Sequence, residues 1–426
     1  MKAIPLVNLP DDYRYHFGPL LIEAYQQHGP IFAAHGGKIV YLIGPEANRL
    51  VLVSQRHKFS NHIGWGTIFD VTETFGNGLL TMDGEEHDQH RKVMNPAFAV
   101  NYMDKYLPIM NRLIGLHVAR WAEQEEIDLF QEARKLTFDI AAQALTGLEQ
   151  SDHFRELFTL LLNGPAVRLP EEEYRQWVAS LEQQLQDLLL PIIEERRHHP
   201  TDDLFSILVQ HRDAEGRPMS VEKLIAHVNI LLVAGHETST SLSTWLLYLL
   251  IQHKDYTQRI LQEQSELVGE RADPTLDELK RMKVLENALN EAERLYPPVA
   301  NGPRGVLEDF DFHGYHVPAG TFVFYSILAS HYLPEIFANP TVFDPDRFAP
   351  PREEHKKNPY ALVGFGGGPR ICIGINFAQI EIKALASHVL RHYTLEVVPD
   401  QRIAQVYSVT GWPVEGIRIR VKKKAL

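Results

Sequence analysis

Most of the chain carries the spacing of apolar residues that produces amphipathic helices. Between about residues 84 and 296, apolar side chains recur three and four positions apart with little interruption. Helices of this kind bury their apolar stripes against one another, which constrains the chain to a mainly α fold. We expect helices at roughly 84–96, 103–122, 129–147, 151–162, 171–198, 202–211, 220–252, 255–268 and 281–296.

Outside this helical run, alternating apolar residues predict a smaller β-rich region. Ile31–Ile43 alternates around two glycines, as a β-hairpin does. We expect one small sheet, built from both ends of the chain, and a single domain over residues 1–426, because no linker or repeat divides it. The other expected elements are helices at Leu20–Gln27, 45–54 and from Cys372 to about His392, a glycine-rich loop over His62–Gly78, short strands between about 305 and 325, and a hairpin in the tail.

Charge and cysteine content exclude several classes of protein. A net charge of −13 argues against nucleic acid as a partner. With one cysteine the chain has no internal disulfide, which is typical of a reducing compartment. The N-terminal segment is neither a signal peptide nor an anchor, and no apolar run reaches the ~18 residues of a membrane span. We therefore expect a cytoplasmic protein, a monomer without a membrane anchor.

The segment 220–252 is apolar on most of its circumference, so we expect a buried helix of about 48 Å. Its middle, Ala234-Gly-His-Glu-Thr-Ser-Thr240, contains poor helix formers. One interpretation is a kink whose hydroxyls bond to preceding carbonyls. The other is a functional site, in which Gly235 lets a bulky group lie against the helix while Glu237 and Thr238 supply an acid and a hydroxyl.

The only cysteine lies in Phe365-Gly-Gly-Gly-Pro-Arg-Ile-Cys-Ile-Gly374. A lone cysteine is usually a small buried hydrophobe. That interpretation leaves the three glycines from Gly366, the charge of Arg370 and the small Gly374 unexplained. Glycines let a backbone approach a flat group closely, and a nearby cation favours a thiolate. The decapeptide therefore predicts a Cys372 thiolate in contact with a large planar cofactor, as in haem-thiolate proteins.

This decapeptide resembles the haem-binding loop of the cytochrome P-450 superfamily, Phe-x-x-Gly-x-Arg-x-Cys-x-Gly, at every fixed position. The resemblance covers the whole chain and implies the superfamily's fold, in which a long central helix lies over haem b and the cysteine-bearing loop lies on the other face. Cys372 would be the axial iron ligand. Matches to the family's oxygen-activation motif are Ala234, Gly235, Glu237 and Thr238, which would form the dioxygen groove and relay protons.

Two further groups of charged residues match the family pattern. Glu291-Ala-Glu-Arg294 alone is compatible with an exposed helical pair of little energetic value. By resemblance, Glu291, Arg294 and Arg347 form a structural cluster behind the haem, with no catalytic role.

His87 and Arg91 are four residues apart and share a helix face, which by itself is compatible with a surface cluster. The family often has tryptophan in place of His87. By resemblance these two residues, with Arg304 and Arg370, donate to the haem propionates, a strong type of charge-assisted bond.

The resemblance implies a monooxygenase that inserts one atom of O2 into an apolar C–H or C=C bond. Electrons would come from a separate ferredoxin or flavodoxin, since no reductase is fused, with Arg91, Lys92 and Lys383 as candidate contacts. A peroxide-driven peroxygenase, a haem-thiolate isomerase, and a non-catalytic sensor or electron carrier remain alternatives. The intact Glu237-Thr238 pair argues against the first two, and only His236 offers a sixth protein ligand.

By position, a set of mainly apolar residues should line the substrate pocket, together with the turn at 164–169. Their character predicts a lipophilic substrate such as a fatty acid, terpenoid, steroid or retinoid. No carboxylate-binding arginine lies in these segments, which disfavours a tightly held fatty acid. The residues are Ile63, Trp65, Phe69, Leu231, Val299, Ala300 and Val409.

Overall fold

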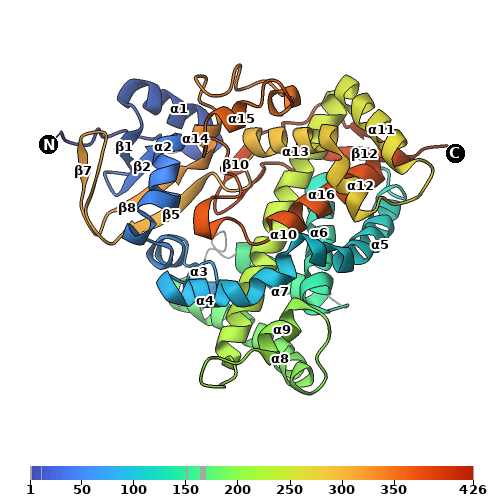
Figure 1. The fold of residues 1–426 in the computed structure, drawn as a ribbon, viewed down its shortest axis with the longest axis horizontal. Helices are drawn as coiled ribbons and strands as arrows, with labels where there is room; N and C mark the ends of the chain where they lie inside the picture. The colour runs from blue at the N-terminus through green and yellow to red at the C-terminus, as the bar shows by residue number, and fades with distance from the viewer. Residues whose placement is uncertain (1, 11, 150–151, 164–168, 426) are drawn as a thin grey trace.

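The protein folds as a broad helical body with a strand-rich part on one side (Figure 1). The computed structural model describes residues 2–10, 12–149, 152–163 and 169–425. The predicted helical run is confirmed in outline. The helices of this run are α4 (Gly84–Met94), α5 (Met103–Trp121), α6 (Leu129–Thr146), α7 (Asp152–Asn163), α8 (Glu171–His198), α9 (Leu204–Gln210), α10 (Val221–Gln252), α11 (Lys254–Val268), α12 (Leu276–Arg281) and α13 (Lys283–Leu295).

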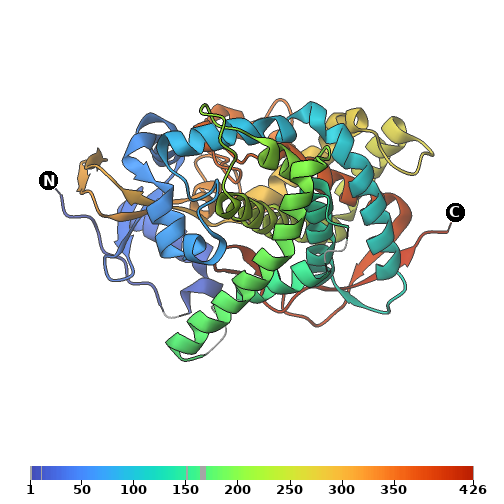
Figure 2. The ribbon, with the colours of Figure 1, turned by 90° about the horizontal axis from the view of Figure 1, so that it is seen from below.

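Helix α10 passes through the middle of the molecule, and Figure 2 views it almost along its axis. The Ser220 side chain caps its start by accepting the N–H of Lys223. Helices α6 and α13 pack against it, as does α16 (Ile375–His392), which follows the cysteine loop. An apolar helix is stable in water only when neighbours cover it, and these three supply that cover.

Strands form several small sheets. The largest has the order β1-β2-β8-β5-β3, with β1 and β2 as the predicted hairpin. Strands from the C-terminal tail do not join it, so the prediction of one sheet from both ends was wrong. Helix α16 carries the tail to the opposite side of the molecule from β1, and there β12 pairs with β4 and β9 (Figure 1). The strands are β1 (Ile31–Ala34), β2 (Ile39–Ile43), β3 (Phe59–Ser60), β4 (Ile127–Asp128), β5 (Asn301–Val306), β6 (Phe310–Phe312), β7 (Tyr315–Val317), β8 (Phe322–Ser326), β9 (Tyr393–Val397), β10 (Gln405–Tyr407), β11 (Gly411–Pro413) and β12 (Arg418–Lys423).

The remaining elements are short apart from α1, and they surround the sheet and the cysteine loop. Among the residues described, no helix has the length and apolar character needed to cross a membrane. These elements are α1 (Phe17–His28), α2 (Pro45–Arg49), α3 (Val71–Phe75), α14 (Ile327–His331), α15 (Glu354–Lys357), η1 (Tyr13–Tyr15), η2 (Leu50–Ser54), η3 (Arg56–Lys58), η4 (His62–Thr67), η5 (Asn95–Phe98), η6 (Val100–Tyr102), η8 (Pro345–Phe348) and η9 (Gly368–Arg370).

The segment 62–78 is more helical than its glycines suggest, since η4 and α3 occupy much of it. A Cβ on Gly64 would collide with the backbone of Pro303, and one on Gly78 would collide with the backbone of α10. These glycines allow close packing between elements rather than marking a loop.

The predicted helix 281–296 corresponds to α13, and the sequence analysis missed the short helix α12, which ends just before Met282. The backbone of Met282 leaves the helical region, with ψ at 80°. The carboxylate of Glu263 in α11 then accepts the N–H of Val284 at 2.7 Å and that of Leu285 at 3.2 Å. Because this cap comes from another helix, local periodicity does not reveal the break.

Candidate active site

The cysteine loop lies between η2 and α16, and its own backbone closes it. The N–H of Cys372 donates to the carbonyl of Phe365 at 2.8 Å, and the N–H of Gly366 donates to that of Val363 at 2.8 Å. Gly366 and Gly368 have φ values of 73° and 61°, in the left-handed region that favours glycine.

The glycines of the loop have different roles. A Cβ on Gly368 would lie 2.5 Å from the carbonyl oxygen of Leu52, so this glycine lets the loop pack onto η2. Gly367 packs beside the side chains of Leu52 and Tyr360. Gly374 has more room, since a Cβ there would lie 4.0 Å from the sulfur of Cys372. Sequence analysis attributed all three consecutive glycines to contact with a cofactor, whereas two of them contact protein.

Cys372 is exposed to solvent. Desolvation by the neighbouring protein atoms nevertheless raises the pKa of the Cys372 thiol, while a hydrogen bond from the N–H of Gly374 and the charge of Arg91 oppose the increase. Arg91 also donates to the carbonyl of Ile371 at 2.6 Å. The site thus supplies an N–H donor and a guanidinium to a thiolate, which is the environment that thiolate ligation needs.

On α10, one part of the otherwise buried helix exposes surface. Ala234 is exposed, and Gly235 and Thr238 are half-buried. The Oγ1 of Thr238 donates to the carbonyl of Ala234 at 2.8 Å. Thr240 makes the same bond to the carbonyl of His236, so the hydroxyls do satisfy preceding carbonyls, yet α10 continues without a break. The back-bonding and the accessible surface therefore coexist.

The carboxylate of Glu237 is directed toward α6. It accepts from the Nε of Arg134 at 2.5 Å and lies 3.0 Å from the Nε2 of His236. Burial alone would raise the pKa of Glu237, but His236 and Arg134 outweigh it and hold the pKa below its ordinary value. His236 itself is buried, with Nδ1 bonded to the carbonyl of Leu232 at 2.7 Å, so it is not placed as a free ligand.

A cluster of cations lies beside the loop. Burial and the like charge of Arg304 together lower the pKa of Arg370 to about 10. Arg304 is buried, and its Nη1 donates to the carbonyl of Pro303. Burial and the charge of Arg370 also lower the pKa of His87, which lies 2.9 Å from Asp88.

The donor set of this region fits haem b. Arg304 is buried and Arg370 is half-buried, and the two lie close enough to repel, although Asp83 lies 3.4 Å from Arg370. A further anion beside them is favourable, and the haem propionates are carboxylates. The accessible thiol of Cys372 is on the same loop as Arg370. Helix α10 presents the small residue Ala234 on its exposed part. Roles of His87 and Arg91 in binding propionates stay predictions.

Glu291, Arg294 and Arg347 meet in a completely buried ionic cluster. Arg294 donates to Glu291 through Nε at 2.7 Å and through Nη2 at 2.8 Å. Arg347 donates to Glu291 at 3.1 Å and to Glu354 at 2.7 Å. Sequence analysis missed Glu354. The cluster ties α13 to η8 and α15, which lie outside the helical run.

The expected pocket residues occupy several packed elements. Trp65 and Phe69 have ring centroids 5.6 Å apart, and Phe69 stacks on Phe324 at 6.3 Å. Leu231 and Ala300 are buried, while Ile63, Val299 and Val409 are half-buried. The turn at 164–169 falls largely on residues 164–168, outside the described residues. That the expected residues line one pocket stays a prediction.

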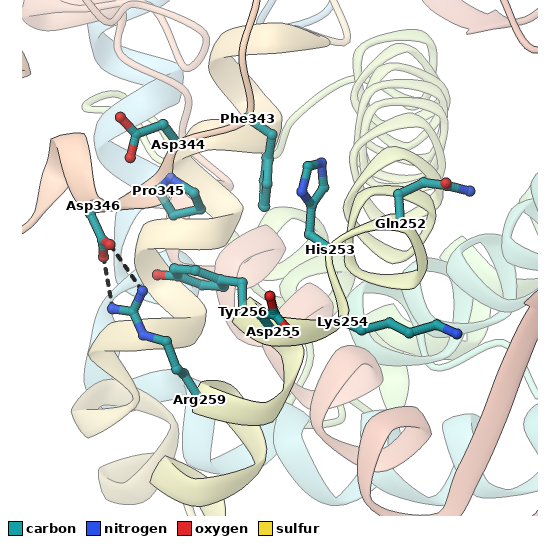
Figure 3. Close-up of a pocket in the computed structure, with 10 residues that line it drawn as sticks. All are labelled: Gln252, His253, Lys254, Asp255, Tyr256, Arg259, Phe343, Asp344, Pro345 and Asp346. Carbon is teal, nitrogen blue, oxygen red and sulfur yellow. Dashed lines mark hydrogen bonds and ion pairs between the residues drawn. The ribbon is translucent and has the colours of Figure 1, made fainter.

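A surface cavity of about 470 Å³ lies elsewhere, at the junction of α10 and α11 (Figure 3). None of its lining residues is a predicted site residue. The rings of His253 and Phe343 lie 4.6 Å apart, and Arg259 donates two hydrogen bonds to Asp346. The cavity is open and polar, and it does not include the cysteine loop.

Two residues of the predicted machinery need correction or addition. Lys383 was a candidate contact for an electron donor, but it is buried and lies 3.2 Å from Glu286. Lys92 is exposed and remains a candidate contact for an electron donor.

Sequence analysis missed Arg134, because its pairing with Glu237 spans 103 positions. No local spacing signals such a contact.

Comparison with known proteins agrees with this arrangement. A sequence model of the family described as cytochrome P450 matches residues 6–411. Cytochrome P450 120 of the cyanobacterium Synechocystis is 32% identical over 93% of this chain and 90% of its own. Sterol 14-demethylase of Arabidopsis thaliana is 29% identical over 96% of this chain and 88% of its own. The chain belongs to the cytochrome P450 family.

Solved structures agree with the fold. The structure of retinoic acid bound cyanobacterial CYP120A1 superposes with a TM-score of 0.88, at 31% identity, over 99% of this chain and all of the other. The cytochrome P450 CYP102L1 superposes with a TM-score of 0.87 at 22% identity over 99% of both chains, which supports the fold alone. The protein is thus a P450 monooxygenase with haem as its cofactor.

Proposed function

We propose that this monooxygenase oxidises an elongated lipophilic substrate of retinoid or related isoprenoid type. The observation that carries the proposal is the apolar character of the residues expected around the pocket, among them Trp65, Phe69, Leu231 and Val299. The relative CYP120A1, at 31% identity, has a structure with retinoic acid bound. Apolar walls favour such a substrate through removal of its surface from water.

The residues of the cysteine loop hold the cofactor in this proposal. Cys372 would bind the iron as a thiolate, stabilised by the N–H of Gly374, and Arg370 of the loop and Arg304 of β5 would bind the propionates. Bound haem supplies the activation of dioxygen and the transfer of one oxygen atom. The protein decides orientation and the access of protons.

Thr238 and Glu237 deliver protons in this proposal. Thr238 holds its proton at Oγ1, against the carbonyl of Ala234, on the accessible part of α10. Glu237 is kept ionised by His236 and Arg134, so it can accept a proton from solvent and pass it on. The pair argues for an O2-dependent enzyme over a peroxide-driven one.

Electrons reach the site from a separate ferredoxin or flavodoxin in this proposal. We propose that residues 1–426 form a single P450 domain, since the described residues belong to one helical body with its sheets. Lys92 on α4 lies one residue after Arg91, which contacts the cysteine loop, and so marks a cationic surface near the sulfur.

The test is spectroscopic and begins with the reduced protein under carbon monoxide. A Soret band near 450 nm supports the thiolate of Cys372, and Cys372→Ala should lose that band, because no other cysteine exists. Titration of the ferric protein with retinoic acid, retinol, a sterol and a saturated fatty acid of similar length should give a high-spin shift for the retinoids. A shift only with the sterol or the fatty acid would refute the substrate class.

A further inference from the structure

Glu293 is a buried carboxyl that the proposed reaction does not use. It lies on α13, one residue before Arg294, and is only 4% exposed. Arg294 is bonded to Glu291 and to backbone carbonyls near α14 and η8. Glu293 instead contacts the segment that leads into the cysteine loop.

The contact is a pair of hydrogen bonds to the backbone. Glu293 accepts the N–H groups of Gly364 and Phe365. A Cβ on Gly364 would overlap the carboxyl group of Glu293, which therefore occupies the space of the missing side chain. The φ of Gly364 is not in the left-handed region, so this overlap, and not backbone strain, explains the glycine.

A second buried side chain extends the same arrangement. The Nε2 of His331 accepts the N–H of Val363 at 3.0 Å. Burial lowers the pKa of His331 to about 3, so its ring is neutral and can accept. Three successive N–H groups, from Val363 to Phe365, thus bond to side chains of two helices. The carbonyl of Phe365 in turn accepts the N–H of Cys372.

Burial raises the pKa of Glu293 to about 8, and the two N–H groups only partly offset this. Burial of a carboxyl group costs more free energy than burial of an apolar side chain of similar size, unless the carboxyl oxygens accept hydrogen bonds. The oxygens of Glu293 do so, because the N–H groups of Gly364 and Phe365 would otherwise be buried without partners.

We propose that Glu293 is a positioning residue for the sulfur of Cys372. It fixes the backbone of Gly364 and Phe365, and the carbonyl of Phe365 accepts the N–H of Cys372. The proposal rests on the proposed role of Cys372 as the iron ligand. It predicts that loss of the Glu293 carboxyl lowers the fraction of protein in which the Cys372 thiolate binds the iron, without a change in overall folding.

The test uses the haem-loaded protein, reduced under carbon monoxide, and compares the bands near 450 and 420 nm. Glu293→Ala should raise the ratio of the 420 nm to the 450 nm species roughly tenfold, as expected for the loss of two buried hydrogen bonds. Glu293→Gln keeps an acceptor and should give a smaller increase. Far-UV circular dichroism and haem content should match those of the wild type.

Gly364→Ala gives an independent check. As a single change, this variant adds a Cβ that displaces the carboxyl group of Glu293, so the 420 nm fraction should rise. Added to Glu293→Ala, it should change little, because the two changes remove the same contact. The matched control is Glu381→Ala, which removes a buried carboxyl whose pKa is likewise raised to about 8 and which contacts none of these N–H groups. It should leave the band ratio within about twofold.

The outcomes separate this inference from the proposed function. A wild-type protein without a 450 nm band overturns the thiolate assignment and this inference with it. A wild-type 450 nm band that Glu293→Ala and Gly364→Ala leave unchanged overturns only the inference. An equal increase in Glu381→Ala also overturns it, since any lost buried carboxyl would then have the same effect.

Discussion

Arg347→Leu removes one cation from the buried ionic cluster behind the cysteine loop. The side chain of Arg347 is completely buried, and it donates to Glu291 at 3.1 Å, to Glu354 at 2.7 Å and to the carbonyl of Ala338 at 2.9 Å. Loss of one partner leaves buried carboxylates partly uncompensated, which costs about 3–5 kcal/mol. That is a large share of the roughly 5–15 kcal/mol by which proteins are stable.

The nearby pair of Arg259 with Asp346 is a matched control (Figure 3). It is bidentate, with bonds of 2.8 and 2.9 Å, but both side chains are about half exposed. Exposed pairs contribute about 0–1 kcal/mol. Arg259→Leu should therefore change the free energy of unfolding little.

Thermal unfolding of the haem-loaded proteins, followed by circular dichroism, measures the difference. For a chain of this length the unfolding entropy is roughly 0.9 kcal/mol/K, so Arg347→Leu should lower Tm by about 3–6 °C, and Arg259→Leu by about 1 °C or less. Equal shifts for the two variants would refute the argument that burial decides the value of these pairs.

Three more changes test the site. Thr238→Ala should lower the product formed per electron pair and raise peroxide release, measured by coupled turnover; unchanged coupling would contradict its role in proton delivery. His236 and Arg134 hold the pKa of Glu237 below its ordinary 4.5 against the effect of burial, so the ionised carboxylate should stabilise the fold fully above pH 4.5 and less below it. The difference in Tm between the wild type and Glu237→Gln should therefore narrow on acidification. A difference that widens would contradict the lowered pKa. Gly368→Ala imposes a left-handed backbone costing about 1–2 kcal/mol and collides with η2, so Tm and haem retention should fall.

Two matched controls accompany these variants. Ser243 makes the same backward bond on α10 as Thr238, to the carbonyl of Ser239 at 2.7 Å, but it is buried. Ser243→Ala should leave coupling unchanged. Gly115 lies in α5 with no atom closer than 4.0 Å to a Cβ, so Gly115→Ala should raise stability by about 0.5–1 kcal/mol.

Errors in the sequence-based prediction share one physical origin. The glycines of 62–78 indicate a loop when considered alone, yet Gly64 and Gly78 allow close contact with elements far along the chain. The missed helix α12 is separated from α13 at Met282, where Glu263 of α11 caps the start of α13. In both cases a tertiary contact overrides the local preference.

Lys383 shows the same limit for function. A lysine near the loop in sequence is a reasonable contact for an electron donor, but helix packing buries it against Glu286. Sequence alone does not reveal on which side of a helix the solvent lies once other elements cover it.

The sequence alone determined the family, the long central helix and the candidate iron ligand, because each depends on residue types at short, fixed spacings. Only the tertiary structure decided which charges are paired and which side chains reach the loop. The bond of Arg134 to Glu237 spans 103 positions and that of Arg347 to Glu291 spans 56. The contact of Glu293 with Gly364 likewise joins parts of the chain that are far apart in sequence. Burial and distance in space set the strength of such contacts, and neither quantity is a local property of the chain.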